Sequence, residues 1–201
     1  MEINATLVKE LREKTGVGMM DCKKALQESK GDLTLAVEYL RKKGIATAKK
    51  RGGRATSEGQ VASYIHPGAK IGVLVEVNCE TDFSGKTEDF TAFVKNIAMQ
   101  IAAANPLSVD REGIPASVLE KEREIYVGQA KESGKPDKVI DKIVEGKMSK
   151  FYSEVCLLEQ PYVKNPDITI QDLLNELMAK TGENILIRRF MRYQLGDSDE
   201  R

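Results

Sequence analysis

The chain has 201 residues, of which 41% are hydrophobic and 31% charged, so it can bury a substantial core in one or two domains. Lys and Arg together number 31, as do Asp and Glu, and this balance argues against a protein that holds nucleic acid through a basic excess. The chain contains no Trp and only 5% aromatic residues, which disfavours base stacking on exposed aromatic rings.

The sequence predicts a cytoplasmic protein with no contact to the membrane. No stretch reaches the ~20 consecutive apolar residues that a membrane helix needs, and the first residues lack the basic and apolar regions of a signal peptide. Cys22, Cys79 and Cys156 are far apart and odd in number. Neither a zinc site nor a disulfide framework is expected from them, and we expect no metal and no cofactor.

Residues 1–45 predict a small domain of three short helices. Asp32 is expected to cap the third helix, and Gly44 to end it in a left-handed conformation. Three helices joined by glycine turns resemble the ubiquitin-associated fold, which often acts as a docking module. Met19 and Met20 would point about 100° apart on the second helix, so we expect one of them near the surface. Methionines here are typical of core or boundary positions, and also of adaptable partner contacts.

Residues 46–57 predict a basic linker between this domain and the rest of the chain. The segment carries Lys49, Lys50, Arg51 and Arg54 around two glycines. Such a run could contact RNA. The neutral charge balance elsewhere favours a solvated hinge that begins as a helix.

Residues 58–196 predict an α+β core domain that begins with a β-hairpin of strands 58–66 and 70–80. The second strand places apolar residues at every odd position, which indicates one strongly buried face. It runs into a short junction, Glu80-Thr81-Asp82-Phe83-Ser84-Gly85, before the next helix. A carboxylate and a large aromatic side chain on a short turn, anchored by a rigid strand, could act as a wedge in a partner protein.

The remainder of the core domain predicts four helices and one more strand. In chain order we expect a helix from Thr87 to Asn105, a helix from Pro115 with Ile125 facing inward, a helix opened by Pro136, an irregular segment 149–167, a helix from Thr169 to Gly182, a strand Ile185–Leu195 and a frayed tail 197–201. The alternation of the last strand breaks at Arg188-Arg189, which indicates a bulge or an edge position. The helices would cover one face of a small antiparallel sheet.

Motifs for catalysis or nucleotide binding are weak. Gly85-Lys86-Thr87 lies between a strand and a helix like the end of a phosphate-binding loop, but Glu80 replaces the glycine required five residues earlier and would repel phosphate. His66 is the only histidine and stands at a hairpin turn, where this residue is far more often structural than catalytic. Cys79 faces the buried side, so a Cys–His pair is not expected. We therefore predict that the protein is not an enzyme.

Two motifs are similar to the signatures of the elongation factor Ts family. They are Thr-Gly-Val-Gly-Met-Met-Asp-Cys-Lys-Lys-Ala-Leu at residues 15–26 and Asn-Cys-Glu-Thr-Asp-Phe at residues 78–83, in the family order. Shorter patterns extend the likeness over nearly the whole chain: Ile97-Ala98-Met99, Gly146-Lys147-Met148, Gln160-Pro161 and Arg188-Arg189-Phe190. The family usually continues after the aromatic residue with Val-Ala-Arg-Asn, where this chain has Ser84-Gly85-Lys86-Thr87. Gln100 stands where many members have histidine.

The resemblance implies a guanine-nucleotide exchange factor that binds elongation factor Tu in its GDP-bound and nucleotide-free forms. Met19 and Met20 would dock on the nucleotide-binding domain of that GTPase. Thr81, Asp82 and Phe83 would form a turn that enters a cleft between two of its helices, disturbs the Mg²⁺ and phosphate site and releases GDP. Long family members carry two core subdomains and a coiled-coil insertion. A single core here implies a homodimer through the core domain.

Two other functions fit the same residues. The three-helix domain could belong to a protein-binding adaptor without an exchange role, and the basic run at 49–54 could belong to an RNA-binding translation protein. Taken alone, a Phe at the end of a buried strand is typical of a core residue. The match of Phe83 to the family motif favours the wedge, with no direct role in nucleic-acid binding.

Overall fold

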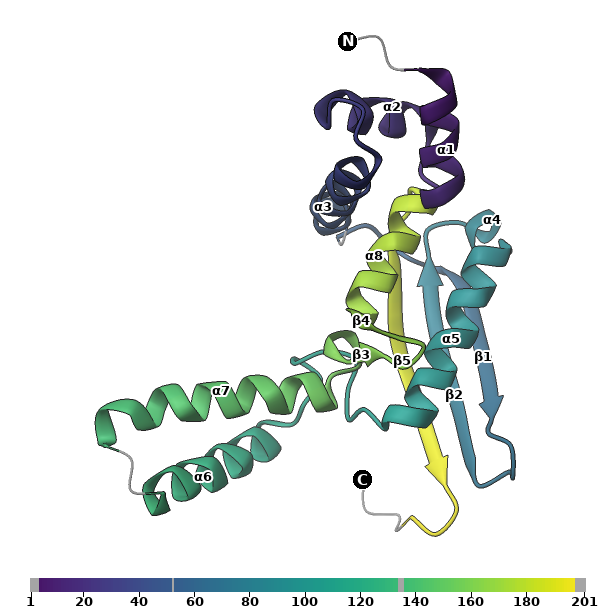
Figure 1. Ribbon diagram of the computed structural model, residues 1–201. Helices are drawn as coiled ribbons and strands as arrows, with labels where there is room; N and C mark the ends of the chain where they lie inside the picture. Colours follow the sequence, from purple (N-terminus) through teal and green to yellow (C-terminus); the bar gives the residue numbers. More distant parts are fainter. Residues whose placement is uncertain (1–3, 52, 134–135, 198–201) are drawn as a thin grey trace. The chain divides into compact units, whose positions relative to one another are not determined.

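The computed structural model describes residues 4–51, 53–133 and 136–197, and Figure 1 shows its elements. In chain order these are α1 (Ala5–Thr15), α2 (Met19–Glu28), α3 (Leu33–Arg51), β1 (Glu58–Ile65), β2 (Ile71–Cys79), α4 (Asp82–Gly85), α5 (Glu88–Ala104), α6 (Ala116–Glu132), α7 (Asp137–Val155), the 3₁₀ helix η1 (Leu157–Glu159), β3 (Pro161–Tyr162), β4 (Asn165–Thr169), α8 (Ile170–Thr181) and β5 (Ile185–Gln194). The fold is α+β, as predicted, with an antiparallel sheet in the order β1-β2-β5. Within the described ranges, no helix is both long and apolar enough to cross a membrane.

Two compact units interleave along the chain. One comprises residues 1–60, 77–94 and 172–186, and the other residues 61–76, 95–171 and 187–201. The residues that the sequence singles out, at 19–20 and 81–83, all belong to the first unit. The geometry of the candidate site is therefore contained in one unit.

The three N-terminal helices of the first unit pack around a core of their own. Asn4 caps α1 by accepting a hydrogen bond from the Thr6 amide at 3.0 Å, and Gly16 ends the helix with φ 68°. All three helices contribute buried side chains to the core, namely Val8, Leu11, Cys22, Ala25, Leu26, Ala36 and Leu40.

Helix α3 corrects the predicted end of the third helix. It continues past Gly44 to Arg51 and so occupies the first part of the expected linker 46–57. A Cβ atom on Gly44 would lie 3.4 Å from the Cβ of Ala179 in α8, so this glycine permits a close approach of two helices. The side chains of Lys49, Lys50 and Arg51, in the run that could contact RNA, are not among those that the structure describes.

Strand β2 and helix α5 show the predicted buried faces. Val75, Val77 and Cys79 are almost completely buried on alternate positions of β2. Thr87 caps α5, because its hydroxyl accepts a hydrogen bond from the Phe90 amide at 3.2 Å. The buried stripe of α5 is continuous and consists of Phe90, Phe93, Val94, Ile97, Ala98, Ile101 and Ala102.

Helices α6 and α7, in the second unit, pack on each other rather than on the sheet. Their shared core consists of Ile114, Ala130, Ile140, Val144, Met148, Phe151 and Cys156. Ile125 is exposed and not inward, because one hairpin partner buries only a narrow stripe of each helix.

The segment 149–167 is ordered, which corrects its prediction as irregular. Helix α7 continues to Val155, since no helix-breaking residue interrupts it before Cys156. β3 then pairs with β4, with Pro161 opposite Thr169 and Tyr162 opposite Asn165. Strand order puts β5 at an edge of the main sheet, which confirms the edge interpretation of the break at residues 188–189.

Candidate functional site

The candidate site centres on a short helical turn that presents Phe83 to solvent. We call Thr81–Gly85 the wedge turn; it comprises α4 and its N-cap, Thr81, whose hydroxyl accepts a hydrogen bond from the Ser84 amide at 3.3 Å. Ser84 and Gly85 are buried, whereas the Phe83 side chain points away and the residue is 80% exposed. The interpretation of Phe83 as a core residue is therefore wrong.

Two glycines bring the backbone beneath the wedge turn into close contact. A Cβ atom on Gly59 would lie 2.1 Å from the carbonyl oxygen of Val77, and the Gly59 φ of 138° suits only glycine. A Cβ atom on Gly85 would meet Gly59 Cα at 3.5 Å and the Cys79 sulfur at 3.3 Å. The side chain of Gln60 donates to the Gly85 carbonyl at 2.7 Å. The turn therefore rests directly on strands β1 and β2.

Cys79 supports the turn as a hydrogen-bond donor rather than as a nucleophile. Its thiol donates to the Thr81 carbonyl oxygen at 3.1 Å. Burial, followed by the neighbouring carboxylates of Glu183 and Glu58, raises the pKa of the thiol. The sulfur stays protonated at neutral pH, as a donor must, and has little thiolate character for chemistry.

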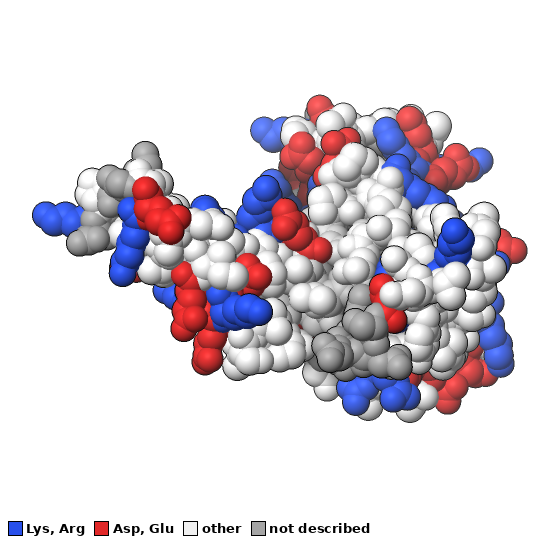
Figure 2. All heavy atoms as spheres, turned by 90° about the horizontal axis from the view of Figure 1, so that it is seen from below, with Lys and Arg blue, Asp and Glu red and all other residues white. Residues whose placement is uncertain are grey.

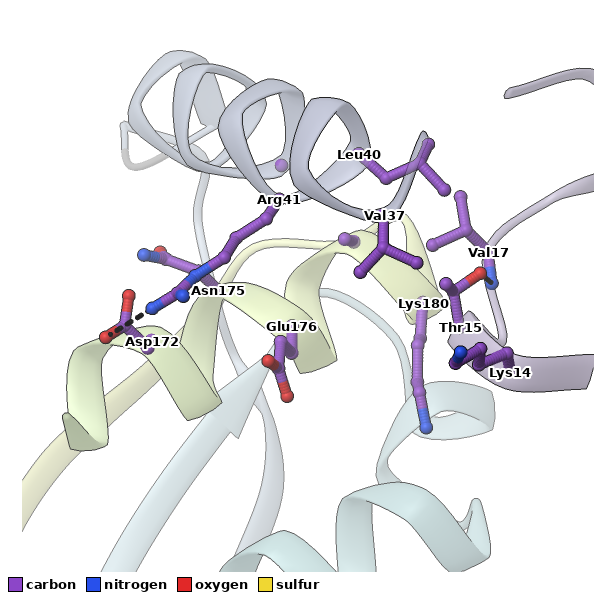
Figure 3. A pocket seen from close by; sticks show the side chains of 12 residues that line it. Lys14, Thr15, Val17, Val37, Leu40, Arg41, Asp172, Asn175, Glu176 and Lys180 are labelled. Carbon is purple, nitrogen blue, oxygen red and sulfur yellow. Dashed lines mark hydrogen bonds and ion pairs between the residues drawn. The ribbon is translucent and has the colours of Figure 1, made fainter. Parts of the chain in front are cut away.

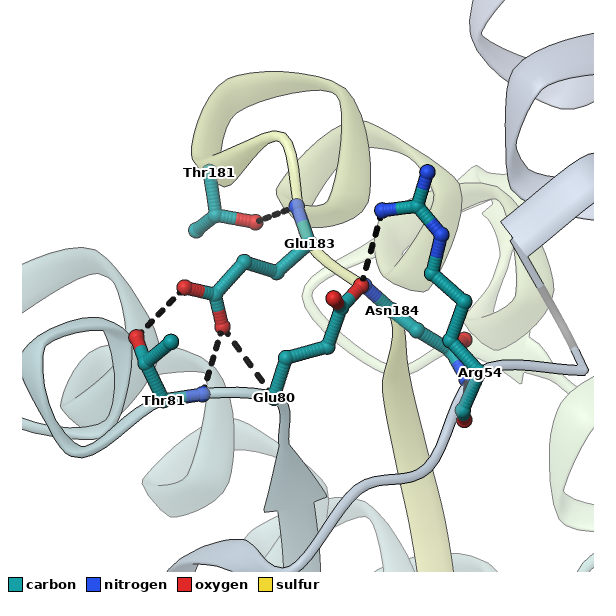
Figure 4. A network of polar contacts seen from close by, with 6 residues as sticks. All are labelled: Arg54, Glu80, Thr81, Thr181, Glu183 and Asn184. Atoms are coloured by element: carbon teal, nitrogen blue, oxygen red, sulfur yellow. Dashed lines mark hydrogen bonds and ion pairs between the residues drawn. The ribbon is translucent and has the colours of Figure 1, made fainter.

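A polar network, shown in Figure 4, ties the start of the wedge turn to the loop after α8. The carboxylate of Glu183 accepts hydrogen bonds from the amides of Glu80 and Thr81, both at 3.1 Å, and from the Thr81 hydroxyl at 2.5 Å. Sequence analysis missed Glu183. It lies 102 residues from Thr81, and no local pattern marks such a contact.

Asp82 forms an ion pair within the turn region. Its carboxylate accepts a hydrogen bond from the Lys86 ammonium group at 2.7 Å, with the i,i+4 spacing of helical ion pairs. This hydrogen bond lowers the pKa of Asp82 and raises that of Lys86. The spacing from 82 to 86 is visible in the sequence and could have predicted the pair.

Replacing Lys86 by methionine is expected to raise the pKa of Asp82 toward the ordinary aspartate value, because the charged hydrogen-bond donor is lost. A carboxyl pKa that is lower in the folded than in the unfolded chain adds stability above the unfolded value, and this contribution disappears as pH falls through the folded value. A carbon-detected NMR titration of Asp82 checks the shift. An unchanged pKa in Lys86→Met would show that the pair does not form in solution.

Met19 and Met20 are both exposed, by 58% and 74%, where one exposed methionine was expected. The buried stripe of α2 begins only at Cys22, so the first turn of the helix extends beyond the small core. The two side chains line a hollow of about 360 Å³ with Ala5, Val8, Lys9, Arg12 and Lys23. The lining of this hollow thus combines two thioethers with three basic side chains.

Helix α8 also borders the three-helix domain, as Figure 3 shows. A hollow of about 250 Å³ lies between the end of α1, helix α3 and α8. Val17, Val37 and Leu40 form an apolar wall of this hollow, and the Arg41 guanidinium pairs with the Asp172 carboxylate at 3.0 Å. Helix α8 therefore contacts the methionine-bearing domain, and Glu183, in the loop that follows the helix, contacts the wedge turn.

The remaining chemical candidates carry no catalytic arrangement. The ring nitrogen Nδ1 of His66 shares a hydrogen bond with the Tyr64 hydroxyl at 3.1 Å on an exposed hairpin end. Among the residues that the structure describes, no group of three or more His, Cys, Asp or Glu side chains could hold a metal ion. The described cysteines are all buried and free.

Comparisons with known proteins decide the family. The family described as Elongation factor TS matches residues 45–197. Elongation factor Ts of Syntrophobacter fumaroxidans is 63% identical over 98% of both chains. That of Geotalea daltonii is 61% identical over 100% of this chain and 93% of its own. The chain belongs to the elongation factor Ts family. The predicted resemblance is thereby confirmed, and the family is one of translation elongation factors.

The sequence analysis expects Ser84, Gly85 and Gln100 to be departures from the pattern of the elongation factor Ts family, and the structure gives their surroundings. Ser84 is buried, and its hydroxyl has no hydrogen-bond partner among the described residues. Gly85 fits a space where a Cβ atom would press on the Cys79 sulfur. Gln100 is fully buried, and its side-chain amide is both a donor and an acceptor of hydrogen bonds. It donates to the Gln160 side chain at 3.2 Å and accepts from the Val163 amide at 2.9 Å. These departures affect the support of the turn and of β3, and leave Phe83 exposed.

Proposed function

We propose that this protein is the guanine-nucleotide exchange factor of elongation factor Tu. The observation that carries the proposal is the exposed Phe83 ring on a turn that is anchored to two strands and to the loop after α8. Leaving a Phe side chain in water forgoes about 2–3 kcal/mol of burial free energy. A partner protein that encloses the ring would recover this free energy.

The energy of insertion is large enough to weaken nucleotide binding. Nanomolar binding of a nucleotide corresponds to about 12 kcal/mol, of which the factor need oppose only a part. A coupling free energy of about 3 kcal/mol changes nucleotide affinity roughly 150-fold. Insertion must favour the distorted GTPase over the GDP-bound form, because only a difference between the two states shifts the equilibrium. By linkage, GDP then weakens the binding of this chain by the same factor.

We assign the steps as follows. The three-helix domain docks first through Met19 and Met20, and the wedge turn then enters a cleft of the nucleotide-binding domain. Phe83 fills an apolar pocket, while the Asp82 carboxylate, already paired with Lys86, accepts further hydrogen bonds from the partner. The displaced elements of the partner release Mg²⁺ and the β-phosphate, and GDP leaves. No covalent bond forms or breaks in these steps, so we infer that the exchange factor is not an enzyme. We also infer that it acts in the cytoplasm.

The test is the release of fluorescent GDP from elongation factor Tu, with and without this chain, in the presence of excess unlabelled nucleotide. We expect the release rate to rise with the concentration of the chain and to reach a plateau. A rate that the chain leaves unchanged at micromolar concentrations would contradict the proposal.

The rival functions have less support from the described residues. Figure 2 shows basic and acidic side chains interspersed on the face drawn, rather than gathered by sign as RNA binding favours. An adaptor function accounts for the exposed methionines of α2, but it gives no role to the exposed ring on the wedge turn. Salt-sensitive RNA binding, or capture of peptides without any effect on the GTPase, would favour a rival.

We also infer that two copies associate through the outer face of the sheet in the second unit. Exposed apolar side chains occupy this face on all three strands, namely Val61, Ile65, Leu74, Met191 and Tyr193. Within the face, the Arg189 guanidinium bonds to the Glu76 carboxylate at 2.7 Å, so this charged pair is internally neutralised. An apolar sheet surface of this kind is typical of an interface between subunits.

Replacing Met191 by glutamate is expected to convert the dimer to a monomer, because two buried carboxylates would then face the interface without partners. Sedimentation equilibrium measures the mass. The control is Lys95→Glu on the exposed side of α5, which should remain dimeric. A wild-type chain that sediments as a monomer at tens of micromolar would overturn the inference.

A further inference from the structure

We propose that Glu183 is the positioning residue of the wedge turn, which fixes the direction in which the Phe83 ring leaves the protein. The inference rests on the exchange function proposed above and adds a residue to it. The Glu183 carboxylate bonds to Glu80 and Thr81, the two residues before α4. It acts on the backbone from which the ring projects.

The Glu183 carboxylate holds both of the peptide groups that lead into the turn. One oxygen accepts the amides of Glu80 and Thr81, and the other accepts the Thr81 hydroxyl. Hydrogen bonds to an ionised carboxylate are shorter and stronger than neutral ones. Glu80 and Thr81 precede α4, which begins at Asp82, so their amides have no acceptor within that helix and the Glu183 carboxylate supplies one.

The residues that lead into the wedge turn and the loop after α8 form hydrogen bonds in both directions. The Glu80 carboxylate accepts a hydrogen bond from the Asn184 amide at 2.6 Å and pairs with the Arg54 guanidinium at 3.4 Å. The Asn184 side chain, which is buried, donates to the Arg54 carbonyl oxygen at 2.9 Å. Each segment thus supplies a carboxylate to the backbone of the other, which fixes their register (Figure 4).

Glu183 is itself held in place by the end of α8. Gly182 takes φ 77° and ends the helix, and the Glu183 amide then donates to the Thr181 hydroxyl at 3.3 Å. That hydroxyl donates in turn to the Leu177 carbonyl oxygen at 3.0 Å. The carboxylate therefore starts from a fixed backbone position rather than from a free loop.

A four-residue helix needs such support because it has too few internal hydrogen bonds to persist alone. Without Glu183, the wedge turn would populate several conformations, and only a fraction would aim Phe83 correctly. The observed exchange rate then falls to that fraction of the wild-type rate. The fold should persist, because Glu183 and Glu80 are only half-buried and Thr81 is exposed, so the substitution opens no cavity in the core.

The test is a double-mutant cycle on the maximal rate of GDP release from elongation factor Tu. We expect Glu183→Ala to lower this rate about 10- to 30-fold, as a loss of one or more charge-assisted hydrogen bonds would. In a Phe83→Ala background, the same substitution should change the rate less than about 2-fold, since Glu183 acts only through the ring. Glu124→Ala, on the exposed side of α6, is the control and should behave as wild type.

Thr81 gives a second route that does not depend on the Glu183 variant. Thr81→Val removes the hydroxyl that donates to Glu183 and also caps α4, so it should slow release, whereas Thr81→Ser keeps both interactions and should restore it. Circular dichroism must show all variants folded. A wild-type rate in Glu183→Ala, or an equal loss in both backgrounds, overturns the inference. If Phe83→Ala alone leaves exchange unchanged, the proposed function itself fails. If Phe83→Ala slows exchange and Glu183→Ala does not, only the positioning role fails.

Discussion

Replacing Phe83 by alanine is expected to slow the GDP release that this chain stimulates by about 30- to 150-fold, which corresponds to about 2–3 kcal/mol. The reason is that the ring supplies most of the apolar area of the wedge turn. Its 80% exposure means that the substitution removes few contacts within the protein. The melting temperature should therefore change by less than about 2 °C. Stopped-flow release of fluorescent GDP and a thermal melt measure the two quantities.

The matched control is Leu107→Ala, which also removes an exposed apolar side chain but lies outside the candidate site. It should retain the wild-type exchange rate. An unchanged rate in Phe83→Ala with the protein folded would contradict the wedge. A large loss of stability would show instead that the ring supports the fold of the free protein.

Replacing Gly59 by alanine is expected to destabilise the protein by roughly 3–5 kcal/mol. The new Cβ atom would lie 2.1 Å from the Val77 carbonyl oxygen, and backbone rather than a flexible side chain would have to move. The φ of 138° adds strain for any residue with a Cβ atom. Urea unfolding measures the change. Because Gly59 lies under Gly85, exchange should also fall at temperatures where the variant remains folded.

Gly128→Ala is the control for Gly59→Ala. Gly128 lies inside α6, and a Cβ atom there would meet nothing within 4 Å. Alanine should raise stability by about 0.5–1 kcal/mol, because it reduces the conformational freedom of the unfolded chain. Equal stability of Gly59→Ala and wild type would mean that the close approach of β1 to β2 does not exist in solution.

Local patterns in the sequence were sufficient for most helices and strands. The Thr87 cap, the odd-numbered apolar residues of β2 and the glycine that ends α8 each act within a few residues of their own position. The predictions are wrong where residues that are distant in the sequence determine the local structure. Glycine is common at helix ends, which led to the prediction for Gly44. In the structure, the lack of a side chain at Gly44 allows a close approach of Ala179, which lies more than a hundred positions away in the chain.

In the candidate site too, local patterns predict some features, whereas contacts between distant residues determine others. The motif that ends in Phe83 identified the exposed ring correctly, although hydrophobicity alone favours burial. The Asp82–Lys86 pair follows from helical spacing. Glu183 could not be predicted, because an acidic residue after a helix is common and its partners are set by tertiary structure. The prolines at 161 and 166 suggested an irregular segment, whereas short strands accept them where β3 and β4 pair.

The most direct test of the central claim follows the Phe83 ring itself from solvent into the partner. The chain has five Phe residues, so incorporation of 4-fluorophenylalanine gives five fluorine resonances, and Phe83→Leu identifies the one at issue. In the free protein this resonance should show the largest shift between H₂O and D₂O, since Phe90, Phe93 and Phe151 are buried and Phe190 is half-buried. With nucleotide-free elongation factor Tu the shift should vanish, and excess GDP should restore it. A ring that keeps its solvent shift in the complex would contradict the account.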